Sequence, residues 1–162
     1  MITGVKQIGR FWGTISKGGI IIPFEFPNGM TTAGLNALAS AELGGGTQYT
    51  TWYLGLINNS GYTAIAVADT SASHPGWTEL TDYTASNRPP VSFGAPASGV
   101  IATSSAVSFT MNATVSVKGA FLITNDLKGG SIGIMRAHGV FDSAQAFSSG
   151  EVFTINYSST YS

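Results

Sequence analysis

The chain has 162 residues, enough for one domain and too few for two ordinary ones. Charged residues, 7 basic and 8 acidic, make up 9% of the chain and apolar residues 43%, whereas typical globular chains carry about 25% charge. This composition excludes an intrinsically disordered chain, and a net charge of -1 excludes a general nucleic-acid binder, which needs a basic surface for phosphate.

The sequence also lacks the features of cysteine-based sites, of membrane spans and of targeting segments. It contains no cysteine, so disulfides, zinc–thiolate sites and iron–sulfur clusters are ruled out. The longest apolar stretch, residues 18–26, is interrupted by Pro23 and Glu25 and is far shorter than the roughly 20 residues that span a bilayer. We therefore expect no cofactor, no membrane partner and no targeting signal.

Residues 1–29 are predicted to form an extended N-terminal arm with a strand at residues 20–22. Three of the seven basic residues lie in the first 17 positions, and no acidic residue precedes Glu25. The glycine pair at 18–19 and the Pro-Asn-Gly sequence at 27–29 interrupt the segment. The candidate residues for binding a capsid or a neighbouring copy are Lys6, Arg10, Phe11, Trp12 and Lys17. The alternative is that this segment is simply the first strand of the domain.

Residues 31–43 are predicted to be a helix of about three turns. Its apolar residues fall on one stripe, made of Leu35, Leu38, Ala39 and Leu43. Thr31 or Thr32 is a suitable N-cap, and three consecutive glycines at 44–46 end the helix. We expect the stripe to lie across a sheet edge or a barrel mouth.

After residue 46 the apolar pattern has the period of β-strands. About eight short strands separated by turn residues predict an antiparallel β-sandwich over residues 30–162, with jelly-roll or immunoglobulin-like wiring left open. The eight predicted strands are residues 50–57, 62–67, 91–93, 100–103, 107–111, 115–124, 131–135 and 151–157. A short edge strand is also considered at residues 77–80.

Few residues are arranged for catalysis or metal binding. His74 and His138 lack the paired spacing of a metal site, the carboxylates are scattered singly, and no GxSxG nucleophile motif occurs. The glycines at 129–133 are better explained by a hairpin turn than by a phosphate loop. We predict no catalytic or metal-binding residue. The possible loop contacts are His74, Trp77, Tyr83 and Arg88. The candidates for an aromatic sugar platform, with core or interface packing as the alternative, are Trp12, Trp52, Trp77, Tyr49, Tyr53, Tyr62 and Tyr83.

Three segments carry a resemblance to a known group of proteins. The sequence TTAGLNALASAELGGGTQYTTWYLGLI is similar to the start of small virion proteins of tailed bacteriophages, where TTxGLN introduces a helix before a W-Y-x-G-L-I strand. The sequence ASHPGWTEL followed by TDYTASNRPPVSFG resembles their middle loop. The closing segment from GAFLITNDLKGG to EVFTINYS resembles their final hairpin and strand. The resemblance covers residues 31–158.

This resemblance implies a non-enzymatic phage structural protein, one that decorates and cements the capsid. Its partners would be the major capsid protein and other copies of itself, and it would reside on the capsid surface after assembly in the host cytoplasm. The alternative is a tail-fibre or receptor-binding module that contacts host glycans through Trp77, Tyr83 and Arg88. A glycan depolymerase is disfavoured, because the only feature that supports such an enzyme is the presence of scattered carboxylates.

Overall fold

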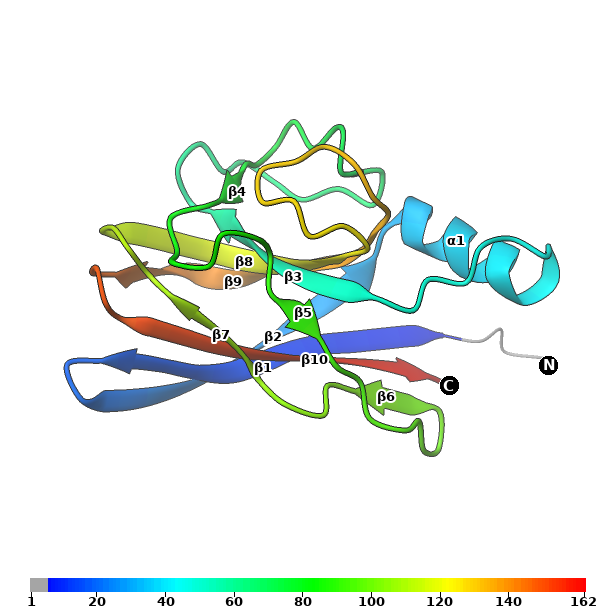
Figure 1. Ribbon diagram of the computed structural model, residues 1–162, viewed down its shortest axis with the longest axis horizontal. Helices are drawn as coiled ribbons and strands as arrows, with labels where there is room; N and C mark the ends of the chain where they lie inside the picture. Colours follow the sequence, from blue (N-terminus) through cyan, green and yellow to red (C-terminus); the bar gives the residue numbers. More distant parts are fainter. Residues whose placement is uncertain (1–5) are drawn as a thin grey trace.

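The computed structural model describes residues 6–162 and confirms a mostly antiparallel, all-β, sandwich-like fold with one short helix (Figure 1). The elements, in chain order, are β1 (Gln7–Lys17), β2 (Ile20–Met30), α1 (Thr32–Leu43), β3 (Trp52–Asn58), β4 (Glu79–Leu80), β5 (Pro90–Val91), β6 (Val100–Ala102), β7 (Val107–Thr110), β8 (Val115–Ile123), β9 (Met135–Phe147) and β10 (Val152–Tyr161).

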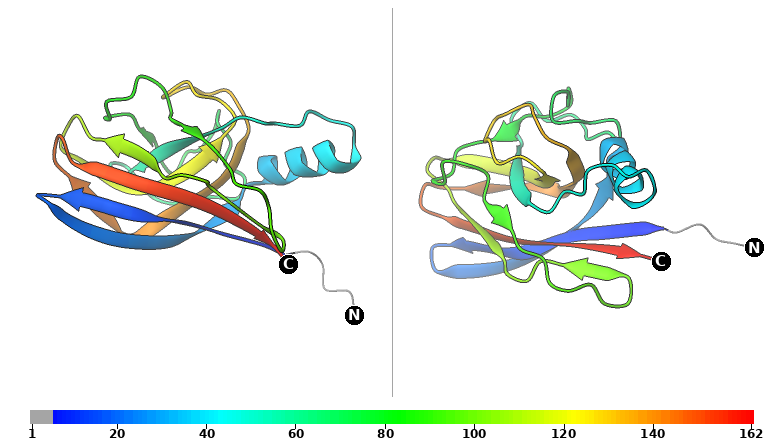
Figure 2. Two further views of the ribbon diagram at one scale, coloured as in Figure 1. Left: turned by 60° about the horizontal axis from the view of Figure 1, so that its bottom comes forward. Right: turned by 45° about the vertical axis from the view of Figure 1, so that its right-hand side comes forward.

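The strands form one path that folds over into two layers. The order is β4-β3-β8-β9-β2-β1-β10-β6, with β5 paired to β3 and β7 paired to β10. β2 and β9 pair only at Gly29–His138 and Met30–Ala137. Beyond that corner the strands separate, so that β2, β1 and β10 form one layer and β9, β8 and β3 form the other (Figure 2).

Aromatic and aliphatic side chains from both layers meet in the core between them. Phe26 on β2 packs on Phe141 of β9 with ring centroids 4.4 Å apart. Phe153 on β10 and Leu54 on β3 are both fully buried in the same cluster. Strands from both ends of the chain therefore contribute to one core, and burial of this apolar surface is the main stabilising contribution.

The predicted N-terminal arm is wrong for residues 7–30, which form the β1–β2 hairpin of the sandwich. β1 lies between β2 and β10 and pairs with both along nearly its whole length. Phe11 and Ile15 point into the core and are 0% and 1% exposed. The chain reverses at Gly18 and Gly19, whose φ angles of 52° and 82° favour glycine. The alternative, a first strand of the domain, describes this segment correctly; residues 1–5 lie outside the described residues.

The predicted helix is confirmed as α1, but its predicted packing is wrong. The Thr31 side chain accepts a 3.0 Å hydrogen bond from the Gly34 N–H and donates to the Met135 carbonyl. The only buried residue within α1 is Gly34, whereas Leu35 and Leu43 are 49% and 87% exposed. The helix is thus attached at its start and projects from one end of the sandwich (Figures 1 and 2).

Long loops cover the outer side of the β3–β8–β9 layer. They enclose a second apolar cluster made of Ile57, Trp77, Phe121, Ile123 and Met135. The strand predicted at residues 62–67 belongs to these loops, because Tyr62 and Ile65 pack on this cluster without strand pairing. The strand predicted at residues 131–135 begins only at Met135 and continues as β9 to Phe147.

Candidate functional site

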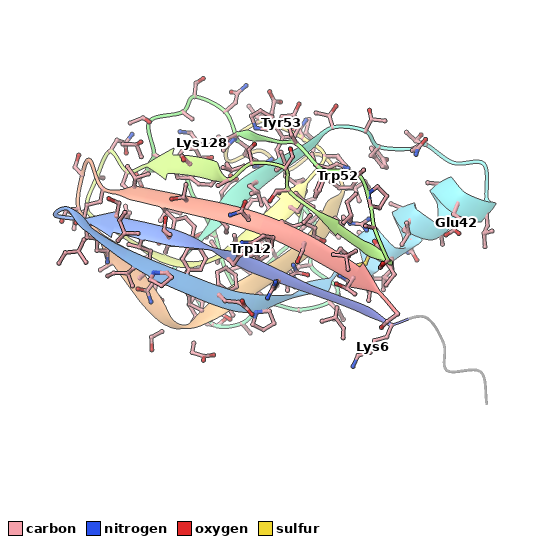
Figure 3. All side chains as sticks on the ribbon, turned by 90° about the horizontal axis from the view of Figure 1, so that it is seen from below. Lys6, Trp12, Glu42, Trp52, Tyr53 and Lys128 are labelled. Atoms are coloured by element: carbon pink, nitrogen blue, oxygen red, sulfur yellow. The ribbon has the colours of Figure 1, made fainter. Side chains whose placement is uncertain are left out.

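The outer surface of the β2–β1–β10 layer is the best candidate for a binding site. Since successive side chains of a strand point to opposite faces, the buried Phe11 requires Arg10 and Trp12 to point outward. The pairing register places Trp12 between Glu25 on β2 and Asn156 on β10. Figure 3 views this layer from below and shows Trp12 near its middle.

We define this surface as the hairpin face, made of the outward side chains Ile8, Arg10, Trp12, Thr14, Glu25, Pro27, Asn156, Ser158 and Thr160. An open groove of about 620 Å³ lies along it, and Val100 and Ala102 of β6 continue its wall. The groove offers an indole ring, short aliphatic groups and hydroxyls. Such a mixture suits contact with another macromolecular surface.

The charged groups on the hairpin face are accessible. Arg10 Nη1 lies 3.1 Å from Glu25 Oε2, and the two side chains are 55% and 59% exposed. The guanidinium carbon of Arg10 lies 5.3 Å from the centroid of the Trp12 ring. Exposed ion pairs contribute only about 0–1 kcal/mol of stability. Arg10 and Glu25 can therefore separate and bind groups of a partner at a small cost in free energy.

The five residues predicted for the N-terminal arm do not form one site. Arg10 and Trp12 lie together on the hairpin face, but Phe11 is in the core. The Lys6 backbone pairs with Ser162, and Lys17 lies at the other end of β1, with its ammonium 4.8 Å from the Phe147 ring centroid. Only two of the five are therefore placed to act together.

The predicted loop contacts are buried, apart from the half-buried His74. Trp77, Tyr83 and Arg88 are 3%, 1% and 2% exposed. His74 stacks on Trp77 with ring centroids 4.0 Å apart, and its Nδ1 donates a 2.8 Å hydrogen bond to the Trp77 carbonyl. The hypothesis that Trp77, Tyr83 and Arg88 contact a glycan is therefore wrong, because these three side chains are buried and a glycan cannot reach them.

Arg88 is the centre of a buried ion pair that holds two loops together. Its Nε and Nη2 atoms donate to the two oxygens of Glu79 at 2.9 and 2.7 Å. Its Nη1 and Nη2 atoms also donate to the carbonyls of Asn125 and Gly130. Glu79 in turn accepts from the Gly129 N–H at 2.8 Å. These bonds attach the loop at 124–134 to the segment containing residues 79–90.

A second buried polar group joins Asp69, Trp77 and His138. Asp69 Oδ2 accepts 2.9 Å hydrogen bonds from the Trp77 indole and the Ala66 N–H, and lies 3.5 Å from His138 Nε2. His138 Nε2 is also 2.9 Å from the Ala66 carbonyl. The role of this group is to position the loop before residue 78. The sequence did not indicate this association, since Asp69 and His138 lie 69 positions apart.

Burial affects the ionisation of two tyrosines. Burial raises the pKa of Tyr83, with a smaller upward contribution from the charge of Glu79 and an opposing contribution from Arg88. Burial likewise raises the pKa of Tyr157. Neither phenol borders the hairpin-face groove, so both belong to the stability of the core and not to the candidate binding site.

Comparisons with known proteins add no assignment. No protein-family model matches the chain, and no curated protein matches it. Within residues 6–162, no group of three or more His, Asp or Glu side chains is placed to hold a metal ion. No helix in this same range has the length and apolarity needed to cross a membrane.

Proposed function

We propose that this chain is a non-enzymatic structural protein of a tailed-bacteriophage particle, which binds the outside of the capsid shell and stabilises it. The observation that carries the proposal is the hairpin face, a grooved surface with the half-buried Trp12 at its middle and the exposed Arg10 and Glu25 beside it. The motif resemblance over residues 31–158 supports the same class of protein. The partner would be the major capsid protein.

The low charge of the chain favours this role. Decoration places many copies side by side, and like-charged neighbours repel one another. A chain with 9% charged residues and a net charge of -1 packs at high density with little mutual repulsion. The hairpin face itself balances Arg10 against Glu25, so apolar contact and hydrogen bonds would supply the affinity.

The test is binding to heads of the encoding phage that lack this protein. The double variant Arg10→Ala/Trp12→Ala should lose at least tenfold in affinity, measured by co-sedimentation, because these side chains form the middle of the hairpin face. The matched control is Ile132→Ala, which removes an apolar side chain 59% exposed in the loop at 124–134. Equal binding by both variants and the unmodified chain would refute the role of this face.

Glycan binding is a second candidate function, now centred on Trp12 instead of the buried loop aromatics. An indole beside an arginine and a carboxylate in an open groove is suited to stacking on a sugar ring and bonding its hydroxyls. A glycan array with the unmodified chain tests it. Binding to glycans that is lost in Trp12→Ala, together with labelling of the tail by antibodies against the chain, would favour this candidate over the capsid.

A further inference from the structure

A β-bulge at the start of β9 turns the Arg136 side chain toward the space between the two layers, at the end of the sandwich from which α1 projects (Figure 1). Ile123 is paired with Met135 and Leu122 with Ala137, so Arg136 is the extra residue. Met135 therefore packs in the outer cluster and Ala137 in the core, although residues two apart on a regular strand share a face. Such bulges re-aim side chains and are common next to functional sites.

The Arg136 guanidinium contacts side chains of both layers. Its carbon lies 5.6 Å from the centroid of the Trp52 ring on β3, and its Nη2 donates to the Tyr161 hydroxyl on β10. A guanidinium carries several further N–H groups, and none of them makes another hydrogen bond within residues 6–162. Arg136 is half-buried, and none of its nitrogen atoms is enclosed without a partner. The remaining donors are therefore accessible from outside.

Arg136 differs from the other two arginines in having no counter-ion. Arg10 is paired with Glu25, and Arg88 is paired with Glu79. Within the part of the chain that the structure describes, no ion pair joins Arg136 to a carboxylate. A partly buried charge without a counter-ion is costly in free energy. A carboxylate supplied by a ligand would recover part of that cost.

An unused hydroxyl group lies near this charge. Tyr157 is 1% exposed, and its hydroxyl makes no hydrogen bond of normal geometry. Burial raises the pKa of Tyr157, and the charge of Arg136 opposes this shift, as expected for a guanidinium close to the phenol. A cation, the face of an indole and two phenols are thus gathered at one end of the sandwich, and residues 6–162 supply no anion to them.

We propose that Arg136 and Trp52 form a binding site for the carboxylate of an acidic side chain on a partner protein. The planar guanidinium presents paired N–H groups that match the two oxygens of a carboxylate, and the Trp52 ring supports its plane. The inference does not depend on what the hairpin face binds, since Arg136 and Trp52 do not belong to that face.

The surroundings of Arg136 favour an acidic side chain over an acidic sugar. A glutamate carries its carboxylate on a slim chain of methylene groups, which can reach a half-buried guanidinium. A uronic acid carries its carboxylate directly on a sugar ring, so a space for the ring is needed beside the guanidinium. The two grooves found on the described surface both lie along β2 and include neither Arg136 nor Trp52.

An NMR titration of the unmodified chain tests the site, because its three tryptophans provide both the reporter and the controls. Trp52 stacks on the unpaired Arg136, Trp12 stacks on Arg10, which is already paired, and Trp77 is buried. The probe is N-acetylglutamate α-amide, whose single carboxylate is that of the side chain. It should shift the Trp52 indole N–H resonance saturably, with a dissociation constant on the order of 10 mM for one charge-assisted contact. The Trp12 and Trp77 resonances should hardly move.

The neutral isostere N-acetylglutamine α-amide is the matched probe and should leave Trp52 unchanged. Equal shifts by the two probes, or equal shifts of Trp12 and Trp52, would overturn the site. Saturation by glucuronate at a lower concentration than by the glutamate probe would overturn the assignment to an acidic side chain.

Substitutions identify the cation that binds the probe. Arg136→Met should abolish the Trp52 shift, whereas Lys17→Met, which removes an equal charge at the far end of β1, should leave it unchanged. A shift that persists in a folded Arg136→Met chain would overturn the role of Arg136. The probe titration itself needs no substitution, so it decides between the outcomes above even where Arg136→Met fails to fold.

Discussion

The buried pair of Arg88 and Glu79 allows a sharp test of what holds the loops on the sandwich. The two side chains are 2% and 7% exposed and share two hydrogen bonds. Replacement Arg88→Met keeps much of the volume but leaves the Glu79 carboxylate buried without its counter-ion. It also removes the donors to the carbonyls of Asn125 and Gly130. Breaking a buried pair in this way costs about 3–5 kcal/mol of unfolding free energy.

The same chain contains a matched control in the exposed pair of Arg10 and Glu25. Its N–O distance is 3.1 Å and both side chains are more than half exposed, so Arg10→Met should cost only about 0–1 kcal/mol. The double variant Arg88→Met/Glu79→Leu removes both buried charges. It should recover much of the loss caused by Arg88→Met, because an apolar pair of similar volume has no desolvation cost.

Urea unfolding followed by tryptophan fluorescence measures these differences. Trp77 reports on the loops directly, because its indole is bonded to Asp69 and packs on Phe121. Arg88→Met should also lower the melting temperature by about 6–20 °C, given about 2–4 °C per kcal/mol for a domain of this size. A loss below about 1 kcal/mol for Arg88→Met, equal to that for Arg10→Met, would refute the reasoning that burial gives the pair its importance.

Two further predictions concern pH and packing. Because burial raises the pKa of Tyr83 and Tyr157, the folded chain retains these protons when the unfolded chain loses them. Stability should therefore fall above about pH 10, by up to ~1.4 kcal/mol per pH unit for each tyrosine; Tyr83→Phe should reduce this slope in urea unfolding between pH 9 and 11. Gly34→Ala should destabilise by about 1–3 kcal/mol in thermal unfolding despite alanine's higher helix propensity, because the added Cβ would lie 2.8 Å from Arg136 Cα; a gain in stability would contradict this packing.

Local patterns predicted the all-β class and the helix but misjudged the first 30 residues. Basic residues next to Phe11 and Trp12 favoured an intermolecular arm, whereas alternation of inward Phe11 and Ile15 with outward Trp12 is the pattern of a half-buried strand. The deciding contact is the pairing of β1 with β10, across nearly the whole length of the chain. A pattern read over a few neighbouring residues cannot indicate a contact between residues so far apart in the sequence.

The candidate site was predicted only in part for the same reason. Arg10 and Trp12 were identified, but Glu25 and Asn156 join them through the register of three strands. Trp77 follows a His-Pro-Gly sequence that is typical of an exposed loop. It is buried because that loop folds back onto Phe121 and Asp69. The polar composition of this loop therefore did not indicate that Trp77 is buried.

The sheet edges offer little room for an added strand. β2 pairs with β9 only at its end, so its edge from residue 20 to residue 28 is available for strand addition. Pro23 and Pro27 interrupt that edge, and because proline has no N–H, they weaken pairing with an incoming strand. The short edge strands β4 and β6 offer little length for pairing. Side-chain contacts on the hairpin face are therefore a better route to binding a partner than strand addition, and they leave the sandwich itself unchanged.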